Sequence, residues 1–93
     1  MKAELFLRDS FSISEAAFVE MVAWTVPFPV KGSIHMFKYR FVYVVNDVCV
    51  LRYDNEAGKG DHKHIGEMEV PYEFLTMDTL ISDFLDDVER QGK

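Results

Sequence analysis

The fold is decided by residues 37–54, which read FKYRFVYVVNDVCVLRYD. Two runs rich in β-branched and aromatic residues, a composition typical of strands, flank the pair Asn46-Asp47. Asn and Asp tolerate positive φ, as the two-residue type I′ turn of a hairpin requires. The stretch therefore predicts a β-hairpin in which Val45 faces Val48 and Phe41 faces Arg52.

Side chains alternate between the two faces of a strand, so this register sorts the hairpin into two sets. The set that is wholly apolar near the turn is expected to face the core. Cys49, the chain's single cysteine, belongs to it and is interpreted as a small buried side chain. The expected core set is Lys38, Arg40, Val42, Val44, Cys49, Leu51 and Tyr53, and the opposite set is Tyr39, Phe41, Tyr43, Val45, Val50, Arg52 and Asp54.

The pattern upstream of the hairpin is weaker. Residues 3–8 predict a short strand, and the polar residues 9–14 predict a connection. Residues 15–26 are ambiguous, because Ser12 and Glu15 have the spacing of a helix capping box while the residues after them alternate as in a strand. We favour a strand over residues 18–26, ended by Pro27.

The C-terminal stretch predicts an amphipathic helix over about residues 77–90, capped by Thr76. Its acidic face is expected to lie in solvent, with a partner-binding patch as the alternative. The whole chain, residues 1–93, predicts one α+β domain in which this helix packs on one face of an antiparallel sheet of about four or five strands. The apolar stripe is Met77, Leu80, Ile81, Phe84, Leu85 and Val88, and the acids are Asp83, Asp86, Asp87 and Glu89.

The candidate site is residues 53–66, YDNEAGKGDHKHIG, which contain three of the five glycines and two of the three histidines. We interpret them as a long ionisable connection after a strand, where binding and catalysis commonly occur. His62 and His64 are two apart and point the same way in an extended segment, so they could share general acid and base work on a 2′-hydroxyl and a leaving oxygen. The candidate catalytic residues are His62, His64, Asp61 and Asp54.

Phosphate contacts are the second expectation for this stretch. Glycines flanking Lys59 would let backbone N–H groups approach an anion. The hairpin brings its cations to the end from which the stretch departs, so we expect the phosphate-binding set to be Lys38, Arg40, Lys59, Lys63, Gly58 and Gly60. The alternatives are a flexible turn with locally capped acids, or a metal at the two histidines completed by His35, Asp54 or Glu67. Two-ligand spacing is a poor metal signal, so we predict no metal and no cofactor.

The net charge of −6 argues against a general nucleic-acid coat, but it hides an asymmetry. Residues 1–52 hold six Lys or Arg against five Asp or Glu, whereas residues 53–93 hold four against eleven. A basic surface on the sheet therefore remains possible. Trp24 and Tyr39 are expected as core or sheet-surface aromatics rather than as platforms that stack on bases. The basic set would be Lys31, Lys38, Arg40, Arg52, Lys59 and Lys63.

Nothing in the sequence indicates a membrane. No run of eighteen apolar residues occurs, and Arg8 and Asp9 interrupt the apolar start that a signal peptide would need. The expectation is therefore a cytoplasmic protein without membrane contact.

Four ordered strings together resemble small prokaryotic proteins of the TumE toxin type. The likeness covers nearly the whole chain and implies the toxin of a toxin–antitoxin pair, neutralised by a helix-turn-helix antitoxin; it implies no particular reaction. With the site residues, it favours a toxin acting on RNA or on the translation machinery; the alternative is a non-enzymatic protein-interaction module. The strings are His35-x-Phe37-Lys38-Tyr39-Arg40, Arg52-Tyr53-Asp54-Asn55-Glu56-x-Gly58-Lys59-Gly60-Asp61-His62-x-His64, Pro71-Tyr72-x-Phe74 and Leu80-x-x-Asp83-Phe84-x-x-Asp87-Val88.

Overall fold

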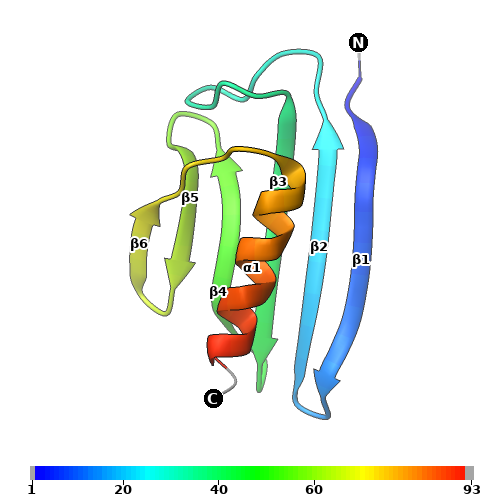
Figure 1. Ribbon diagram of the computed structural model, residues 1–93, viewed down its shortest axis with the longest axis vertical. Helices are drawn as coiled ribbons and strands as arrows, with labels where there is room; N and C mark the ends of the chain where they lie inside the picture. The colour runs from blue at the N-terminus through cyan, green and yellow to red at the C-terminus, as the bar shows by residue number, and fades with distance from the viewer. Residues whose placement is uncertain (1, 92–93) are drawn as a thin grey trace.

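A computed structural model describes residues 2–91, with six antiparallel strands that follow one another in the sheet in chain order, and one helix (Figure 1). The α+β prediction is confirmed, with more strands than the four or five expected. The elements are β1 (Glu4–Ser14), β2 (Ala17–Thr25), β3 (Phe37–Val45), β4 (Val48–Glu56), β5 (Gly60–Ile65), β6 (Met68–Pro71) and α1 (Met77–Gln91).

The hairpin of β3 and β4 turns where the sequence predicted. Asn46 and Asp47 have φ of 51° and 65°, as in a type I′ turn, and Val45 pairs with Val48. Beyond Cys49 the register shifts by one residue, because Val50 is the extra residue of a β-bulge. Phe41 consequently faces Tyr53, and the predicted pairing with Arg52 is wrong.

The bulge also decides which side chains fill the core. It brings Leu51 and Tyr53 of β4 to the same face as the aromatic residues of β3, where they are buried against α1. Of the predicted core set, Val42, Leu51 and Tyr53 are buried and Val44 is half-buried, and the prediction is wrong for the exposed Lys38, Arg40 and Cys49. Aromatic side chains bury more apolar area than valines, which favours the observed face. The buried residues of this face are Tyr39, Phe41, Tyr43, Leu51 and Tyr53.

The first two strands form a long hairpin. Residues 17–25 are a strand, as we favoured over a helix, and buried Val19 and Met21 alternate in it with more exposed side chains. The predicted connection at residues 9–14 is wrong, because β1 continues to Ser14 and pairs with β2 along its length. An edge strand faces solvent, so the polar residues between Asp9 and Ser14 are tolerated there.

The candidate stretch, residues 53–66, is not a long connection. β4 continues to Glu56 and β5 begins at Gly60, which leaves a three-residue turn. Gly58 and Gly60 adopt φ of 89° and 74°, a region that L side chains rarely adopt. The hairpin continues through Gly66, whose φ is 61°, into the short strand β6. The stretch thus belongs to the sheet, and its side chains are divided between the two faces.

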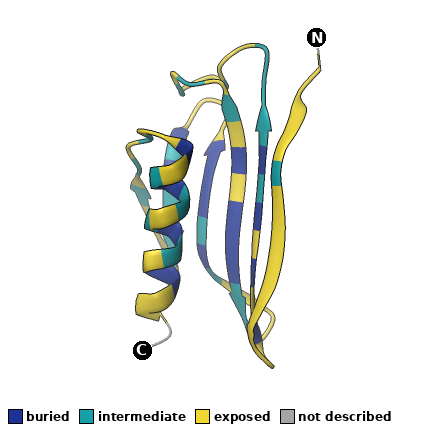
Figure 2. Cartoon of the chain, turned by 45° about the vertical axis from the view of Figure 1, so that its right-hand side comes forward, coloured by how far each residue is buried: buried dark blue, intermediate teal, exposed yellow. Residues whose placement is uncertain are grey.

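The helix covers one face of the sheet and leaves the other uncovered (Figure 2). Thr76 caps it as predicted, since its Oγ1 accepts the Thr79 N–H at 3.0 Å. Phe84 packs edge-on against Phe41 and Tyr53, with ring centroids 5.4 and 5.5 Å apart. Burial of each such side chain contributes roughly 1.5–3 kcal/mol before entropy is counted. We call the covered side the helix face and the other the open face.

Candidate functional site

Two cross-strand rows bring the ionisable residues of the open face together. Arg40 of β3 lies opposite Asp54 of β4, which lies opposite His62 of β5. One row further along, Arg52 lies opposite His64. Cross-strand partners share a face, so these side chains lie on the side away from the helix. The imidazoles of His62 and His64 lie side by side, as their spacing predicts, with ring centroids 4.9 Å apart.

His62 is buried and held between two acceptors. Its Nδ1 is 3.0 Å from the carbonyl oxygen of Gly60, which can only accept a hydrogen bond, so Nδ1 carries a proton. Its Nε2 is 2.8 Å from Oδ1 of Asp54, an ion-pair distance, although the N–H is not aligned for a hydrogen bond. The Asp54 carboxylate therefore lies beside the second ring nitrogen, where it can orient the imidazole. His62 is therefore arranged as a proton donor.

His64 has the opposite arrangement. Its Nε2 is 2.9 Å from Nη2 of Arg52, and a guanidinium has donors but no acceptor. The nitrogen therefore accepts a hydrogen bond from Arg52, which favours the tautomer with its proton on Nδ1. Arg52 also places its Nε 3.4 Å from Oδ2 of Asp54, so the guanidinium lies between His64 and Asp54 and contacts both. Glu69 lies 3.5 Å from the same imidazole, at the edge of the site.

Asp54, His62 and His64 could in principle ligate a metal, since their ligand atoms lie within 4.8 Å of one another. The surrounding charges do not favour this use. Arg52 occupies the lone pair of His64 and lies beside Asp54, so a cation would have to displace a guanidinium before it could bind. The residues fit proton transfer better than metal coordination.

The predicted phosphate ligands are divided between three places. Lys38 and Arg40 are exposed on the open face, and the Lys38 ammonium group donates one hydrogen bond to the carbonyl oxygen of Asn55 at 3.2 Å. Lys59 lies in the turn beside Glu56. The amide of Gly58 in that turn donates to the Lys31 carbonyl oxygen and is not free for an anion. Lys63 lies on the helix face.

Asp61 also lies on the helix face, away from the two histidines. Its carboxylate receives hydrogen bonds from Ser33 at 2.5 Å and from His35 and Tyr39 at 2.7 Å. The His35 ring accepts the Phe37 N–H through Nδ1 and stacks on Phe74 at 3.7 Å. We call these residues the Asp61 anchor, because they fix residues 26–36 to the start of β5. Burial and the bond to Asp61 raise the pKa of Tyr39.

Lys63 belongs to a second closed network on the helix face, formed with α1. Its Nζ is 3.1 Å from Oδ2 of Asp87, which also accepts a hydrogen bond from the Tyr53 hydroxyl, while Oδ1 accepts one from Arg90. Burial raises the pKa of the Asp87 carboxyl, but hydrogen bonds from Tyr53 and Lys63 outweigh it and lower the pKa overall. The expectation that this acid lies in solvent is wrong, because Asp87 is buried.

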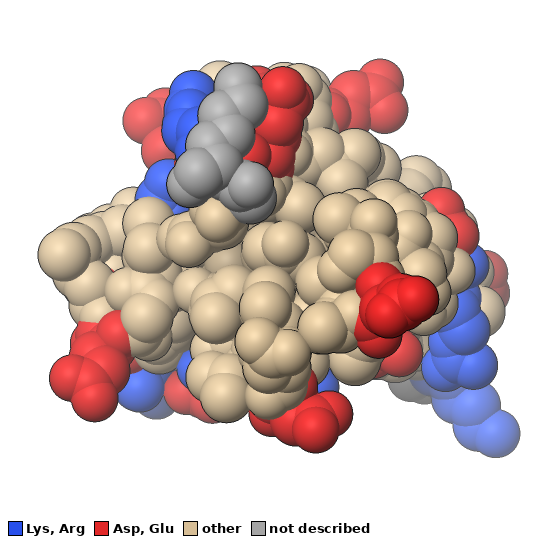
Figure 3. All heavy atoms as spheres, turned by 90° about the horizontal axis from the view of Figure 1, so that it is seen from below, with Lys and Arg blue, Asp and Glu red and all other residues tan. Residues whose placement is uncertain are grey.

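A space-filling view from below shows acidic side chains on both sides of the helix and mixed charges along the opposite side (Figure 3).

The family model for the toxin TumE matches residues 2–92 of the 93-residue chain. The chain belongs to the TumE family. It is therefore a toxin of a toxin–antitoxin system, and such a toxin has an antitoxin partner. Neither the search of curated proteins nor the search of solved structures produced a match.

In this TumE-family chain, sequence reasoning missed Arg52 as a site residue. It appeared only among the basic residues, and its spacing of two from Asp54 was the available signal.

The one helix in residues 2–91, α1, is too short and too polar to cross a membrane.

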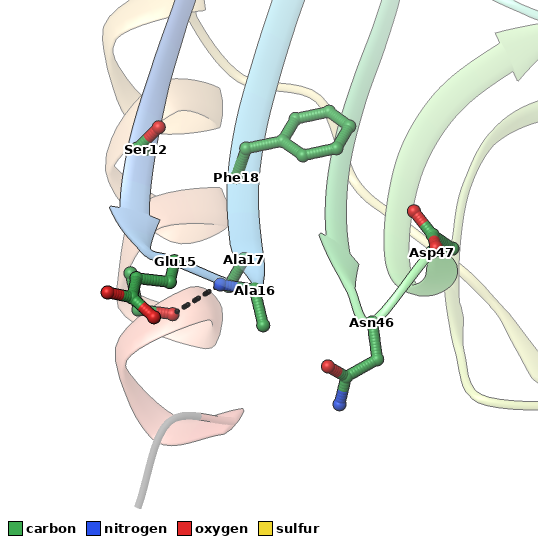
Figure 4. A pocket seen from close by; sticks show the side chains of 8 residues that line it. Ser12, Glu15, Ala16, Ala17, Phe18, Asn46 and Asp47 are labelled. Atoms are coloured by element: carbon green, nitrogen blue, oxygen red, sulfur yellow. Dashed lines mark hydrogen bonds between the residues drawn. The ribbon is translucent and has the colours of Figure 1, made fainter.

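A separate hollow lies between the β1–β2 and β3–β4 turns, and Figure 4 shows it lined by Ser12, Glu15, Phe18, Asn46 and their neighbours. No histidine, lysine or arginine lines it, so it does not compete with the open face as a catalytic candidate.

Proposed function

We propose that this TumE-family toxin is a metal-independent endoribonuclease and that His62 and His64 carry the reaction. The observation that supports it is the opposite hydrogen bonding of two adjacent imidazoles, one arranged as a donor and the other as an acceptor. General acid–base cleavage of RNA needs one group of each kind beside the phosphate. The uncovered sheet face, with exposed Lys38 and Arg40, lets an RNA chain approach the partly exposed His64, beside which His62 lies buried.

The proposed step is an internal transfer at phosphorus. His64 Nε2 takes the proton of the 2′-hydroxyl, the 2′-oxygen bonds to phosphorus, and the bond to the 5′-oxygen breaks as His62 gives that oxygen a proton. The products are a 2′,3′-cyclic phosphate and a 5′-hydroxyl. Arg52 turns from His64 to a phosphate oxygen as the base takes its proton, and Asp54 keeps the His62 ring oriented.

Cleavage of a single-stranded RNA by the purified protein tests this function. His62→Ala and His64→Ala should each lower the rate roughly 10²- to 10⁴-fold. Glu67→Ala, in the exposed β5–β6 turn, is the matched control and should leave the rate unchanged. A substrate with 2′-deoxyribose should resist cleavage, and a chelator should have no effect. Cleavage that survives the double histidine substitution, or that needs a divalent ion, contradicts the proposal.

The antitoxin is proposed to be a helix-turn-helix protein, and the toxin to act in the cytoplasm, where its RNA target would be. The ordered strings shared with TumE-type proteins support the proposal that the antitoxin is a helix-turn-helix protein. Co-expression with the protein from the neighbouring reading frame checks it. Relief of growth arrest and co-purification are expected, and a neighbour without a helix-turn-helix segment would contradict this part.

A non-catalytic protein-interaction toxin is the second candidate, and the outer edge of β1 favours it. Within residues 2–91 no strand pairs with that edge, and Leu5, Phe6 and Ile13 of β1 are each about half exposed. Unpaired edges of this length readily accept another strand. This candidate predicts that growth arrest persists in the double histidine variant. A Pro substitution at Phe11 in β1 would instead abolish the arrest.

A further inference from the structure

An apolar hollow lies on the open face beside the catalytic rows. It is lined by Ala3, Trp24, Val26 and Lys38 and has a volume of about 220 Å³. Trp24 is the chain's only tryptophan and is half-buried, so it remains accessible from the hollow. It lies directly opposite Lys38 in the pairing of β2 with β3. The hollow is thus lined by both the indole ring of Trp24 and the ammonium-bearing side chain of Lys38.

The register connects this hollow to the histidines. Arg40 follows Lys38 by two residues in β3 and therefore points to the same face. Arg40 lies opposite Asp54, which lies opposite His62. Three strand spacings separate β2 from β5, or about 14 Å across the sheet. A short extended stretch of nucleotides spans that distance, with Arg40 between its ends.

We propose that this hollow is a subsite that binds one unpaired base of a single-stranded RNA. The inference rests on the proposed ribonuclease function and names the form of its substrate. The base stacks on Trp24, and Lys38 and Arg40 contact the phosphates that lead to His62. Lys38 gives one of its three donors to Asn55 and keeps two for a phosphate.

The chemistry of the lining favours a base over other ligands. Aromatic side chains beside cations are how proteins hold single-stranded nucleic acid, because every base has a face to stack and every link has a phosphate. A base inside a duplex does not expose its face, so a duplex would not use the hollow. An uncharged apolar ligand would make no use of the two cations next to it.

The sole tryptophan makes the subsite directly measurable. The probe is a single-stranded RNA of about ten nucleotides with 2′-O-methyl riboses, which blocks cleavage, and the readout is tryptophan fluorescence. Saturable quenching is expected. The duplex of the same sequence should quench much more weakly, and Lys38→Ala should lower the slope of log affinity against log salt by about one.

Substitutions then separate stacking from folding, with binding followed by anisotropy of a dye on the RNA. Trp24→Leu should weaken binding roughly ten- to a hundredfold, and Trp24→Phe should retain most of it. Phe18→Leu is the matched control, since Phe18 is an exposed aromatic on the same strand and face, at its far end. It should leave the dissociation constant unchanged.

The outcome is distinguishable from that of the ribonuclease proposal. His62→Ala should slow cleavage strongly but leave quenching intact. If the wild-type protein cleaves no RNA yet shows saturable quenching that depends on Trp24, the subsite stands and the catalytic proposal fails. Quenching that does not saturate, equal quenching by the duplex, or an unchanged dissociation constant for Trp24→Leu would overturn the subsite.

Discussion

The two faces of the sheet each carry an acid beside a histidine, and the two pairs differ in what surrounds them. Asp61 and His35 on the helix face are 2.7 Å apart, and Asp54 and His62 on the open face are 2.8 Å apart. Asp61 accepts three hydrogen bonds, whereas Oδ1 of Asp54 has no aligned donor. A satisfied network rigidifies a fold, and an incompletely satisfied one retains capacity for a ligand or a proton. The same pair of residue types thus has its acid fully hydrogen-bonded on one face and incompletely hydrogen-bonded on the other.

The largest effect on stability is expected from breaking the helix-face pair. Asp61→Ala leaves Ser33, His35 and Tyr39 without their shared acceptor and should lower the free energy of unfolding by about 3 kcal/mol or more. Asp54→Ala should lower it by less than Asp61→Ala, because no donor is aligned with Oδ1 of Asp54, while reducing RNA cleavage. Urea denaturation followed by circular dichroism measures both. Equal losses of stability would remove the distinction between the faces.

Gly60 connects the two faces, so substituting it should perturb both. A Cβ there would lie 2.7 Å from the carbonyl oxygen of Gly32, at a φ of +74°. Gly60→Ala should therefore destabilise the protein by about 2–3 kcal/mol and disturb the carbonyl that binds His62. Gly58→Ala is the control, because its φ is also positive but nothing lies within 4 Å of the added Cβ. It should cost about 1 kcal/mol in unfolding free energy.

Acid should weaken the helix face through Asp87. The pKa of this carboxyl is lower than its ordinary 3.8, because the hydrogen bonds from Tyr53 and Lys63 outweigh its burial. The stabilisation is complete above the ordinary value and is lost as pH falls through the lowered pKa of the folded state. Urea midpoints measured between about pH 2 and 6 should fall less steeply toward acid for Asp87→Asn than for the wild-type protein. Parallel curves would contradict the role given to this group.

The smallest effect on stability is expected from alkylation of Cys49, which lies on the open face near the β3–β4 turn. Because the thiol is exposed, iodoacetamide should alkylate it in the folded protein. The change in unfolding free energy should stay within about 0.5 kcal/mol, as for other surface changes. Mass spectrometry measures the modification and urea denaturation the stability. Protection of Cys49 until the protein unfolds would favour the burial that the sequence first indicated.

Local patterns predicted most of the architecture. The Asn46-Asp47 turn, the strand over residues 17–25 and the capped C-terminal helix all follow from residues close in sequence. The side-by-side placement of His62 and His64 follows from simple alternation. The candidate stretch was misread as a connection because its glycines and charges resemble a loop, whereas paired strands on both sides of β5 keep it extended.

The sequence by itself determined which residues alternate together, where the chain turns, and that Asp54 could reach a histidine. Only the tertiary structure decided which face receives the helix, since the extra residue at Val50 reverses the alternation midway along β4. That choice places Asp61 and Lys63 among the acceptors and donors that lock the helix face, and leaves Arg52, His62 and His64 on the side that solvent can reach. Side-chain alternation is a local property, but the burial of a face depends on what packs against it.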